Sequence, residues 1–288
     1  MKMAENLYSL FDTTTETHWW FVGRRKIVLS LARQIIGGIT QPVIVDVGCG
    51  AGATLKELEK LGSVTGVDIS PRAVGYCRTR GCRRVCLVEE ESLPLGDNKI
   101  SLIVSLDVLE HLDHDYLHLR EYHRILKDDG KILLTVPALP WLWSSHDVAN
   151  HHRRRYTRTH LRKLLEREGW KIEKLSYFCT ILFPLIMVIR LISKGVNKTI
   201  KSYNADWNFK IPGFGINWLF AKIFASEAFW FSRGGFPIGS SLLAVCRKSG
   251  DQGIRLSGDQ VIRVSGDQGI RGSGDQGIRR SGWPSLAT

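Results

Sequence analysis

The residues best suited to chemistry form a glycine-rich turn, because an apolar run from Val43 passes directly into three alternating glycines, Gly48, Gly50 and Gly52. The apolar run predicts a buried strand, and glycines after it allow positive φ angles and a close approach of a ligand to the main chain. Asp68 ends a second apolar strand twenty residues after Gly48, where a carboxylate can accept hydrogen bonds from both hydroxyls of a ribose. Together the two features predict a site for a nucleoside-bearing cofactor.

The glycine turn alone leaves two classes of cofactor open. The spacing Gly48-x-Gly50-x-x-Ala53 also satisfies the looser fingerprint of dinucleotide-binding turns, which is compatible with a nicotinamide-dependent oxidoreductase. Asp46, however, lies two residues before the first glycine. A carboxylate there would repel a pyrophosphate but could anchor an ammonium group, directly or through water. The turn therefore favours a cofactor with an amino-acid part, namely S-adenosylmethionine.

Three later segments resemble, in their order, the successive motifs of the class I methyltransferases. They are 88–95, which is rich in glutamate, 100–112, an apolar strand that runs into an acidic turn, and 124–137, which resembles the family's helix, turn and fifth strand. The resemblance implies S-adenosylmethionine as the cofactor. It assigns the contact with adenine, usually made by an aspartate, to Glu89 with Glu90 as its neighbour. The cofactor residues expected in all are Asp46, Gly48, Cys49, Gly50, Gly52, Asp68, Ile69, Glu89, Glu90 and Leu106, with Cys49 as a small side chain tolerated in the turn rather than a nucleophile.

Residues 5–248 resemble, more narrowly, a bacterial and archaeal methyltransferase subfamily often found near polysaccharide and lipid-sugar genes. The likeness rests on the segments His-Trp-Trp-Phe-x-Gly-Arg-Arg at 18–25, Pro-Trp-Leu-Trp-Ser-x-His-Asp at 140–147 and His-Arg-Arg-Arg-Tyr-Thr at 152–157. The first and third segments suggest contacts with the methyl acceptor from Trp19, Trp20, Arg24, Arg155 and Tyr156.

The order of the elements predicts an α/β fold. Helices expected at 56–61, 72–80 and 116–126 each follow a strand, which implies a parallel sheet covered on both faces and joined by right-handed crossovers. A helix at 159–168 and strands at 171–177 and 241–247 follow. The last two would pair antiparallel, as in the methyltransferase family. The prediction is a Rossmann-like, doubly wound, seven-stranded sheet with an antiparallel C-terminal hairpin.

The chain divides into five predicted parts. A helical leader occupies 1–40, the cofactor-binding core 41–177, a helical hydrophobic insertion 178–240, the final core strand 241–248 and a tail 249–288. The leader's aromatic and basic residues either pack against the core or close over the site as a lid. The tail repeats an eight-residue unit rich in Gly, Ser, Asp and Gln, a composition that predicts disorder.

The insertion is the second unusual feature of the chain. It is apolar from 178 to 190 apart from Pro184, turns basic at Lys194, Lys198 and Lys201, and is aromatic from 218 to 231. The first stretch is shorter than the roughly 20 apolar residues of a spanning helix. Four interpretations stay open: buried helices, a hydrophobic acceptor pocket, peripheral membrane contact through 178–231, and true insertion into a membrane.

The net charge and the cysteine content limit the cellular compartment and the kinds of binding partner that are expected. The formal net charge is +12, and the six cysteines show no Cys-x-x-Cys pair. With no apolar signal-peptide core at the start, a cytoplasmic protein is expected, associated with a membrane if the insertion meets one. The basic charge fits a phosphate on a lipid or sugar nucleotide, or an anionic membrane surface. Nucleic acid is disfavoured because neither an Asn/Asp-Pro-Pro-Tyr/Phe motif nor a Pro-Cys pair is present.

Methyl transfer to a hydroxyl needs a proton acceptor near the transferred methyl. His111 follows the fourth strand at the carboxyl edge of the sheet, and His146 follows the fifth at the same edge; capping or packing roles for them stay open. His114 and His118 lie one helical turn apart beside two aspartates, but solvated polar helix residues explain them, and no metal is expected.

The sequence thus predicts a methyltransferase that uses S-adenosylmethionine. The expected acceptor is a small molecule, lipid-like or saccharide-containing, methylated on oxygen. The alternatives are a nucleic-acid methyltransferase, a nicotinamide-dependent oxidoreductase and a non-catalytic membrane adaptor that retains the cofactor fold.

Overall fold

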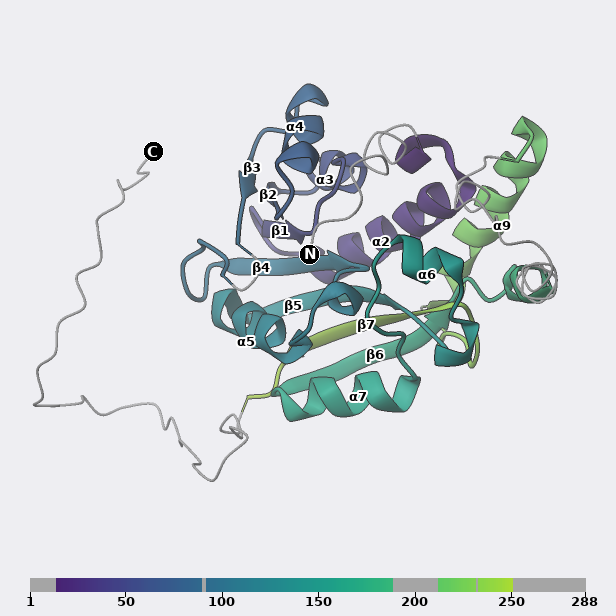
Figure 1. The fold of residues 1–288 in the computed structure, drawn as a ribbon. Coiled ribbons are helices and arrows are strands. Elements are labelled where there is room, and N and C mark those ends of the chain that lie inside the picture. Colours follow the sequence, from purple (N-terminus) through teal and green to yellow (C-terminus); the bar gives the residue numbers. More distant parts are fainter. Residues whose placement is uncertain (1–13, 90–91, 189–211, 232, 251–288) are drawn as a thin grey trace, which may run out of the picture.

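The computed structural model describes residues 14–89, 92–188, 212–231 and 233–250. Within them, seven strands form one mixed sheet in the order β3-β2-β1-β4-β5-β7-β6 (Figure 1). Strands β1 to β5 pair in parallel, whereas β7 lies antiparallel between β5 and β6. The strands are β1 (Val43–Val47), β2 (Ser63–Asp68), β3 (Val85–Leu87), β4 (Ile100–Leu106), β5 (Leu126–Pro137), β6 (Trp170–Phe178) and β7 (Ser241–Lys248). This sheet confirms the predicted fold class, including its antiparallel closing hairpin.

The helices begin and end within a few residues of their predicted bounds. Ser70 and Thr157 cap two of them, because each side chain accepts a hydrogen bond from a backbone amide in the first turn. The turn predicted within 124–137 is absent from the described structure, since β5 starts directly after α5 with an irregular register against β4. The helices are α2 (Trp19–Ile36), α3 (Ala53–Leu58), α4 (Pro71–Thr79), α5 (Asp115–Ile125), α6 (Ser145–Ala149), α7 (Arg158–Arg167) and α9 (Phe214–Phe231), with short 3-10 turns η1 (Leu109–His111) and η2 (Pro140–Leu142).

Helices cover both faces of the sheet (Figure 1). One core joins the sheet to α5 and α7 through buried side chains such as Tyr122 and Leu161. A second core joins the opposite face to α2, α3, α4 and α9 through side chains such as Ile27, Leu55 and Phe224. The two cores leave the carboxyl ends of the parallel strands as the edge where a site can form.

The leader helix α2 packs directly against α9 of the insertion. Gly23 permits this close approach, since a Cβ there would lie 2.5 Å from Cδ1 of Phe224. Trp20 stacks on the Phe224 ring at 5.0 Å between centroids, and the backbone N–H of Trp19 donates to Asn217 Oδ1 at 2.8 Å. The leader is therefore packed in the second core, and its two tryptophans also face the cavity described below.

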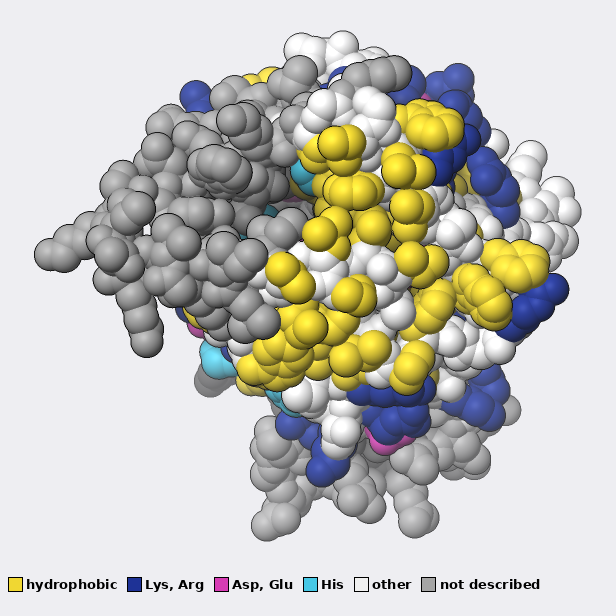
Figure 2. All heavy atoms as spheres, turned by 90° about the vertical axis from the view of Figure 1, so that its right-hand side faces the viewer, with side chains coloured by type: hydrophobic (Ala, Val, Ile, Leu, Met, Phe, Trp, Pro, Cys, Tyr) yellow, Lys and Arg dark blue, Asp and Glu magenta, His cyan; other side chains and the backbone are white. Residues whose placement is uncertain are grey.

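The face that carries α9 and the helical turn at 183–188 is broadly apolar (Figure 2). Lys222 lies over the Trp218 ring and Arg233 over the Phe229 ring, so basic groups interrupt the aromatic surface. No helix in the described part of the chain is long and apolar enough to cross a membrane. The exposed large apolar side chains of α9, of the segment 181–188 and of the segment just before β7 are Ile181, Leu185, Val188, Ile216, Trp218, Leu219, Phe229, Trp230 and Ile238.

Some sequence predictions concern residues beyond those described. They are Glu90 at the adenine position, the basic stretch within 189–211 of the insertion, and the repeat tail from 251 onward. The division of the chain into parts therefore stays a prediction.

Candidate functional site

The glycine turn lies at the carboxyl end of β1, as the sequence predicts. Its first residues are fixed by the neighbouring strand, because the N–H groups of Gly48 and Cys49 donate to Val67 O at 2.9 and 3.1 Å. Gly48 has φ 68°, and a Cβ there would lie 2.6 Å from Val108 Cγ2. Gly50 has φ 55°, and a Cβ on it would have no described atom within 4 Å. The turn therefore offers bare backbone to an open space.

Asp68 ties this turn to the end of β2. Its Oδ2 accepts a hydrogen bond from the Gly50 N–H at 2.9 Å, and its Oδ1 accepts one from the Ser70 N–H at 2.9 Å. Burial raises the pKa of this carboxyl. Each carboxylate oxygen has a second lone pair, so the side chain can still accept hydrogen bonds from a pair of ligand hydroxyls.

Asp46 is buried beneath the same turn, with a side chain that is 2% exposed. Among the described residues its Oδ2 has no hydrogen-bond partner. Burial raises the pKa of Asp46 to about 7, Arg24 opposes that rise and Asp68 adds to it. A buried acceptor without a partner is costly, and a ligand ammonium would remove that cost.

One cavity of about 570 Å³ joins these groups. Of the predicted site residues in the described ranges, all line it except Tyr156. Those in the lining are Trp19, Trp20, Arg24, Asp46, Gly48, Cys49, Gly50, Gly52, Asp68, Ile69, Glu89, Leu106, His111, His146 and Arg155. The glycine turn, the acidic residues at the strand ends, the leader and both candidate histidines thus meet around one space.

The predicted acceptor residues make contacts within the chain. Arg24 forms an ion pair with Asp107. Arg155 donates to Asp147 Oδ1 at 2.7 Å and to Ala138 O at 2.9 Å.

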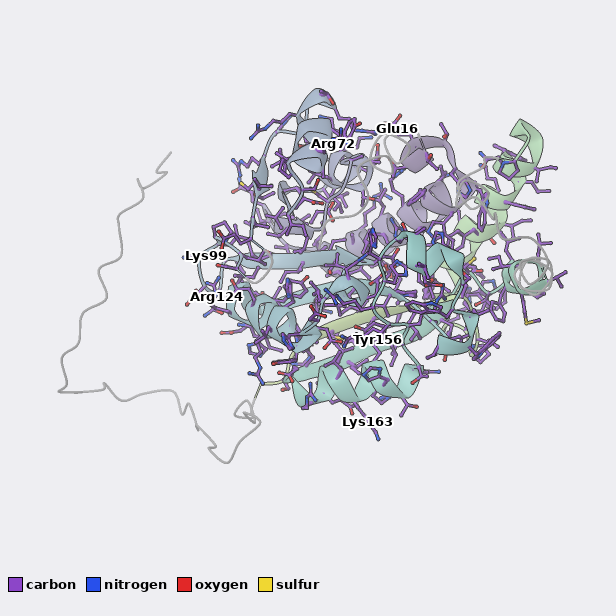
Figure 3. All side chains as sticks on the ribbon, viewed as in Figure 1. Glu16, Arg72, Lys99, Arg124, Tyr156 and Lys163 are labelled. Carbon is purple, nitrogen blue, oxygen red and sulfur yellow. The ribbon has the colours of Figure 1, made fainter. Side chains whose placement is uncertain are left out.

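Tyr156 lies in the interior, whereas Lys163 of α7 points outward (Figure 3). The Tyr156 hydroxyl donates to Asp115 Oδ2 at 2.8 Å. Segment 152–157 is therefore a strap that fastens the loop after β5 to the loop after β4.

The strap brings histidines from two distant segments together. The rings of His111 and His152 lie 4.9 Å apart between centroids, and those of His146 and His152 lie 6.1 Å apart. Burial lowers the pKa of His111 to about 4, so this imidazole is neutral at pH 7.

Sequence reasoning chose neither Glu110 nor His152 as a site residue, although both line the cavity. Glu110 lies inside the methyltransferase-like motif at 100–112, and His152 begins the strap. The two segments meet through contacts such as the hydrogen bond from the Arg153 N–H to Glu110 O at 2.8 Å, which no spacing in the sequence reveals.

Part of the cavity lining is apolar. Leu182, Leu185, Ile186 and Phe220 belong to it, and Leu185 is also 42% exposed. Leu185 lies in the helical turn at 183–188, so the cavity shares a side chain with the apolar face shown in Figure 2.

Comparisons with known proteins agree with this geometry. A family model described as a methyltransferase domain matches residues 45–134. A probable S-adenosylmethionine-dependent methyltransferase of Mycolicibacterium smegmatis is 26% identical over 165 residues, which are 55% of this chain and 62% of that protein. A demethylmenaquinone methyltransferase of Tropheryma whipplei is 28% identical over 145 residues, which are 46% of this chain and 56% of that protein. The chain spans less than two thirds of the length of these curated relatives.

A solved structure shows the same fold. It belongs to the complex between the Haloferax volcanii Trm112 methyltransferase activator and the putative methyltransferase. The likeness has a TM-score of 0.53 at 19% identity and covers 84% of this chain and 95% of that one.

Proposed function

This chain carries a methyltransferase domain of the class I, S-adenosylmethionine-dependent family, and on that premise we propose that it transfers a methyl group to an oxygen atom of a lipid-like acceptor. S-adenosylmethionine is the methyl donor of this family, as expected from the sequence. The observation that carries the proposal is one cavity whose lining includes both the glycine turn and apolar side chains, among them the exposed Leu185.

The residues around the glycine turn fit this cofactor. Asp46 offers a buried acceptor without a described partner to the ammonium group, and Asp68 offers two oxygens to the ribose hydroxyls. Backbone at Gly50 leaves room for the ligand. When bound, the cofactor supplies an electrophilic methyl carbon on a positively charged sulfur.

The apolar part of the lining fits an apolar acceptor. Leu182, Ile186 and Phe220 line that part of the cavity, and Trp19 and Trp20 narrow it from the leader side. Apolar walls exclude water around the reacting atoms and bind the chain of a lipid-like molecule. Relatives of this domain act on small molecules and lipids, which supports the same class.

A hydroxyl acceptor also needs a group that removes its proton. His111 and His146 both line the cavity, and both are only half-buried. A neutral imidazole can accept a proton from a hydroxyl at pH 7. We place the proton acceptor at one of these two side chains.

The apolar face suggests how such an acceptor arrives. Aromatic side chains at Trp218, Phe229 and Trp230 are about half exposed beside Lys222 and Arg233. Aromatic rings with basic neighbours suit the surface of an anionic membrane. Peripheral contact through this face would bring the cavity lining at Leu185 to the bilayer.

Radiolabelled S-adenosylmethionine tests the proposal. The full chain is incubated with a bacterial membrane lipid extract and, separately, with a mixture of nucleotide sugars, and the label is partitioned between organic and aqueous phases. Label in the organic phase is expected for the parent and for Asp128→Asn, whose carboxylate is 92% exposed and far from the cavity lining. Asp68→Ala should transfer none. Label only in the nucleotide-sugar reaction would contradict the lipid-like acceptor.

A further inference from the structure

Three side chains beside the cofactor end of the cavity form a cluster with the donor set of a metal site. Glu110 and His111 come from η1, and His152 comes from the strap. One potential ligand atom from each lies within 4.8 Å of the others. Glu110 Oε1 lies 4.0 Å from His152 Nε2, which is too long for a hydrogen bond.

Glu110 is the unusual member of this cluster. Its side chain is fully buried, and no described residue forms a hydrogen bond with either carboxylate oxygen. The neighbouring acids differ, because Asp107 pairs with Arg24 and Asp147 pairs with Arg155. A buried carboxylate is stabilised by an ion pair or by metal coordination, and the two arginines beside Glu110 already serve other acids.

His152 is oriented as a metal-binding histidine is oriented in proteins. Its Nδ1 lies 2.9 Å from Asp147 Oδ1, which places the ring proton on that nitrogen and leaves the Nε2 lone pair toward Glu110. Metal-ligating histidines commonly use their second nitrogen to bind a carboxylate in this way. Asp147 is itself held by the Ser144 N–H at 2.9 Å and by Arg155.

Hydrogen bonds from Arg153 hold the strap against η1. The N–H of Arg153 donates to Glu110 O at 2.8 Å, and the Arg153 side chain donates to His111 O at 2.9 Å. These hydrogen bonds fix the main chain of the three candidate ligands relative to one another. A metal site needs ligands that are held in place in this way.

We propose that Glu110, His111 and His152 bind a divalent cation of the Zn²⁺ class, with one coordination position open to the cavity. Two imidazoles and one carboxylate favour Zn²⁺ or the chemically similar Co²⁺ over Mg²⁺ and Ca²⁺, which take oxygen ligands. Bonds of about 2.0 Å in a tetrahedral site put ligand atoms about 3.3 Å apart. Since the candidate ligand atoms lie within 4.8 Å of one another, their separations would have to shrink by up to about 1.5 Å to reach that geometry.

The open position gives the cation a role in the proposed function, on which this part of the inference rests. A cation there would hold the acceptor oxygen and lower the pKa of its hydroxyl, whose proton passes to solvent or to His146. His111 would then be a ligand, which leaves His146 as the proton acceptor named above.

Metal binding can be measured without cofactor or acceptor, so its failure is distinguishable from failure of the proposed function. The full chain is treated with a chelator and titrated with ZnCl₂ by calorimetry and with CoCl₂ by absorption in the visible range. One saturable site per chain is expected, with Co²⁺ bands of tetrahedral intensity. Glu110→Gln should weaken binding more than about 100-fold, since loss of a supporting partner alone costs about 10- to 100-fold.

Two further variants keep the test informative. Asp147→Asn should weaken binding by about 10- to 100-fold through its effect on His152, while the exposed His114→Gln should leave it unchanged. S-adenosylhomocysteine binding and circular dichroism report the folding of each variant. A parent without a saturable site, or a site that Glu110→Gln and His152→Asn leave intact, would overturn the proposal.

Discussion

Replacing Asp46 by asparagine is expected to stabilise the ligand-free protein above pH 7 while weakening cofactor binding. The pKa of Asp46 is about 7 in the folded protein and 3.8 for an ordinary aspartate, because the side chain is buried. Between these two values the folded chain holds a proton that the unfolded chain has released. Stability therefore falls as pH rises through this window, by about 1.4 kcal/mol per pH unit.

The size of the effect follows directly. The window spans about 3 pH units, so Asp46 removes up to about 4 kcal/mol between pH 4 and pH 7, and the loss stays constant at higher pH. Asparagine has nearly the same shape and no proton to release. The variant should match the parent near pH 4 and exceed its stability at pH 8 by an amount approaching this limit.

Urea unfolding of both proteins from pH 4 to pH 8.5 measures the difference. Glu110, whose pKa is also raised by burial, affects parent and variant alike. Asp68 interacts electrostatically with Asp46, so the difference between the two proteins reports Asp46 together with its coupling to Asp68. Asp128→Asn, at an exposed site, is the matched control and should show no pH-dependent gain. A variant that is no more stable than the parent at pH 8 would refute the account of Asp46.

Asp46→Asn should also weaken the binding of S-adenosylhomocysteine. An ammonium beside Asp46 favours the ionised carboxylate, so S-adenosylhomocysteine should displace up to about half a proton at pH 7. Calorimetry in two buffers of different ionisation enthalpy counts that proton. Asp46→Asn should lose the release and bind about 10- to 100-fold more weakly, the size expected for one charge-assisted hydrogen bond. Unchanged proton release in the variant would assign the proton to another group.

Three other substitutions test separate parts of the structure. Asp68→Ala should abolish measurable S-adenosylhomocysteine binding in calorimetry while the circular dichroism spectrum stays that of the parent; binding as tight as the parent's would remove Asp68 from the ribose site. Gly23→Ala should lower the free energy of unfolding by about 1–3 kcal/mol, since its Cβ would lie 2.5 Å from an aromatic carbon of α9. The control Gly75→Ala lies in α4, where a Cβ would have no described atom within 4 Å, and it should raise the free energy of unfolding by up to about 1 kcal/mol. Equal effects of the two substitutions in urea unfolding would contradict the close α2–α9 packing. Trp218→Ser should reduce co-sedimentation of the protein with phosphatidylglycerol vesicles. Leu87→Ser changes a side chain that is about equally exposed, on β3, and should not reduce it. Equal vesicle binding by the two variants would argue against the membrane-facing surface.

The fold and the cofactor end could be predicted because their residues are local in sequence. The strand, the glycine turn and Asp46 are contiguous, and Asp68 follows at the spacing of one β-α-β unit. The helices after the strands were predicted within a few residues because each helix follows directly on a strand in a β-α-β unit. The cofactor roles of the individual residues remain predictions until binding is measured.

The contacts outside the cofactor turn could not be predicted in the same way. Glu110 and His152 are 42 positions apart and meet only because the strap pairs with η1 through the main chain. Tyr156 was expected at the acceptor, yet its hydroxyl binds Asp115 inside the protein. The role of Gly23 depends on α9, a helix about 190 residues later in the chain. Each case depends on long-range packing that one sequence does not reveal.

The most direct test of the central claim is calorimetric titration of the full chain with S-adenosylhomocysteine and, separately, with NAD. The structure predicts micromolar binding of S-adenosylhomocysteine at one site per chain and no heat from NAD, because the buried Asp46 carboxylate beneath the glycine turn repels a pyrophosphate. Binding of NAD with no binding of S-adenosylhomocysteine would contradict it.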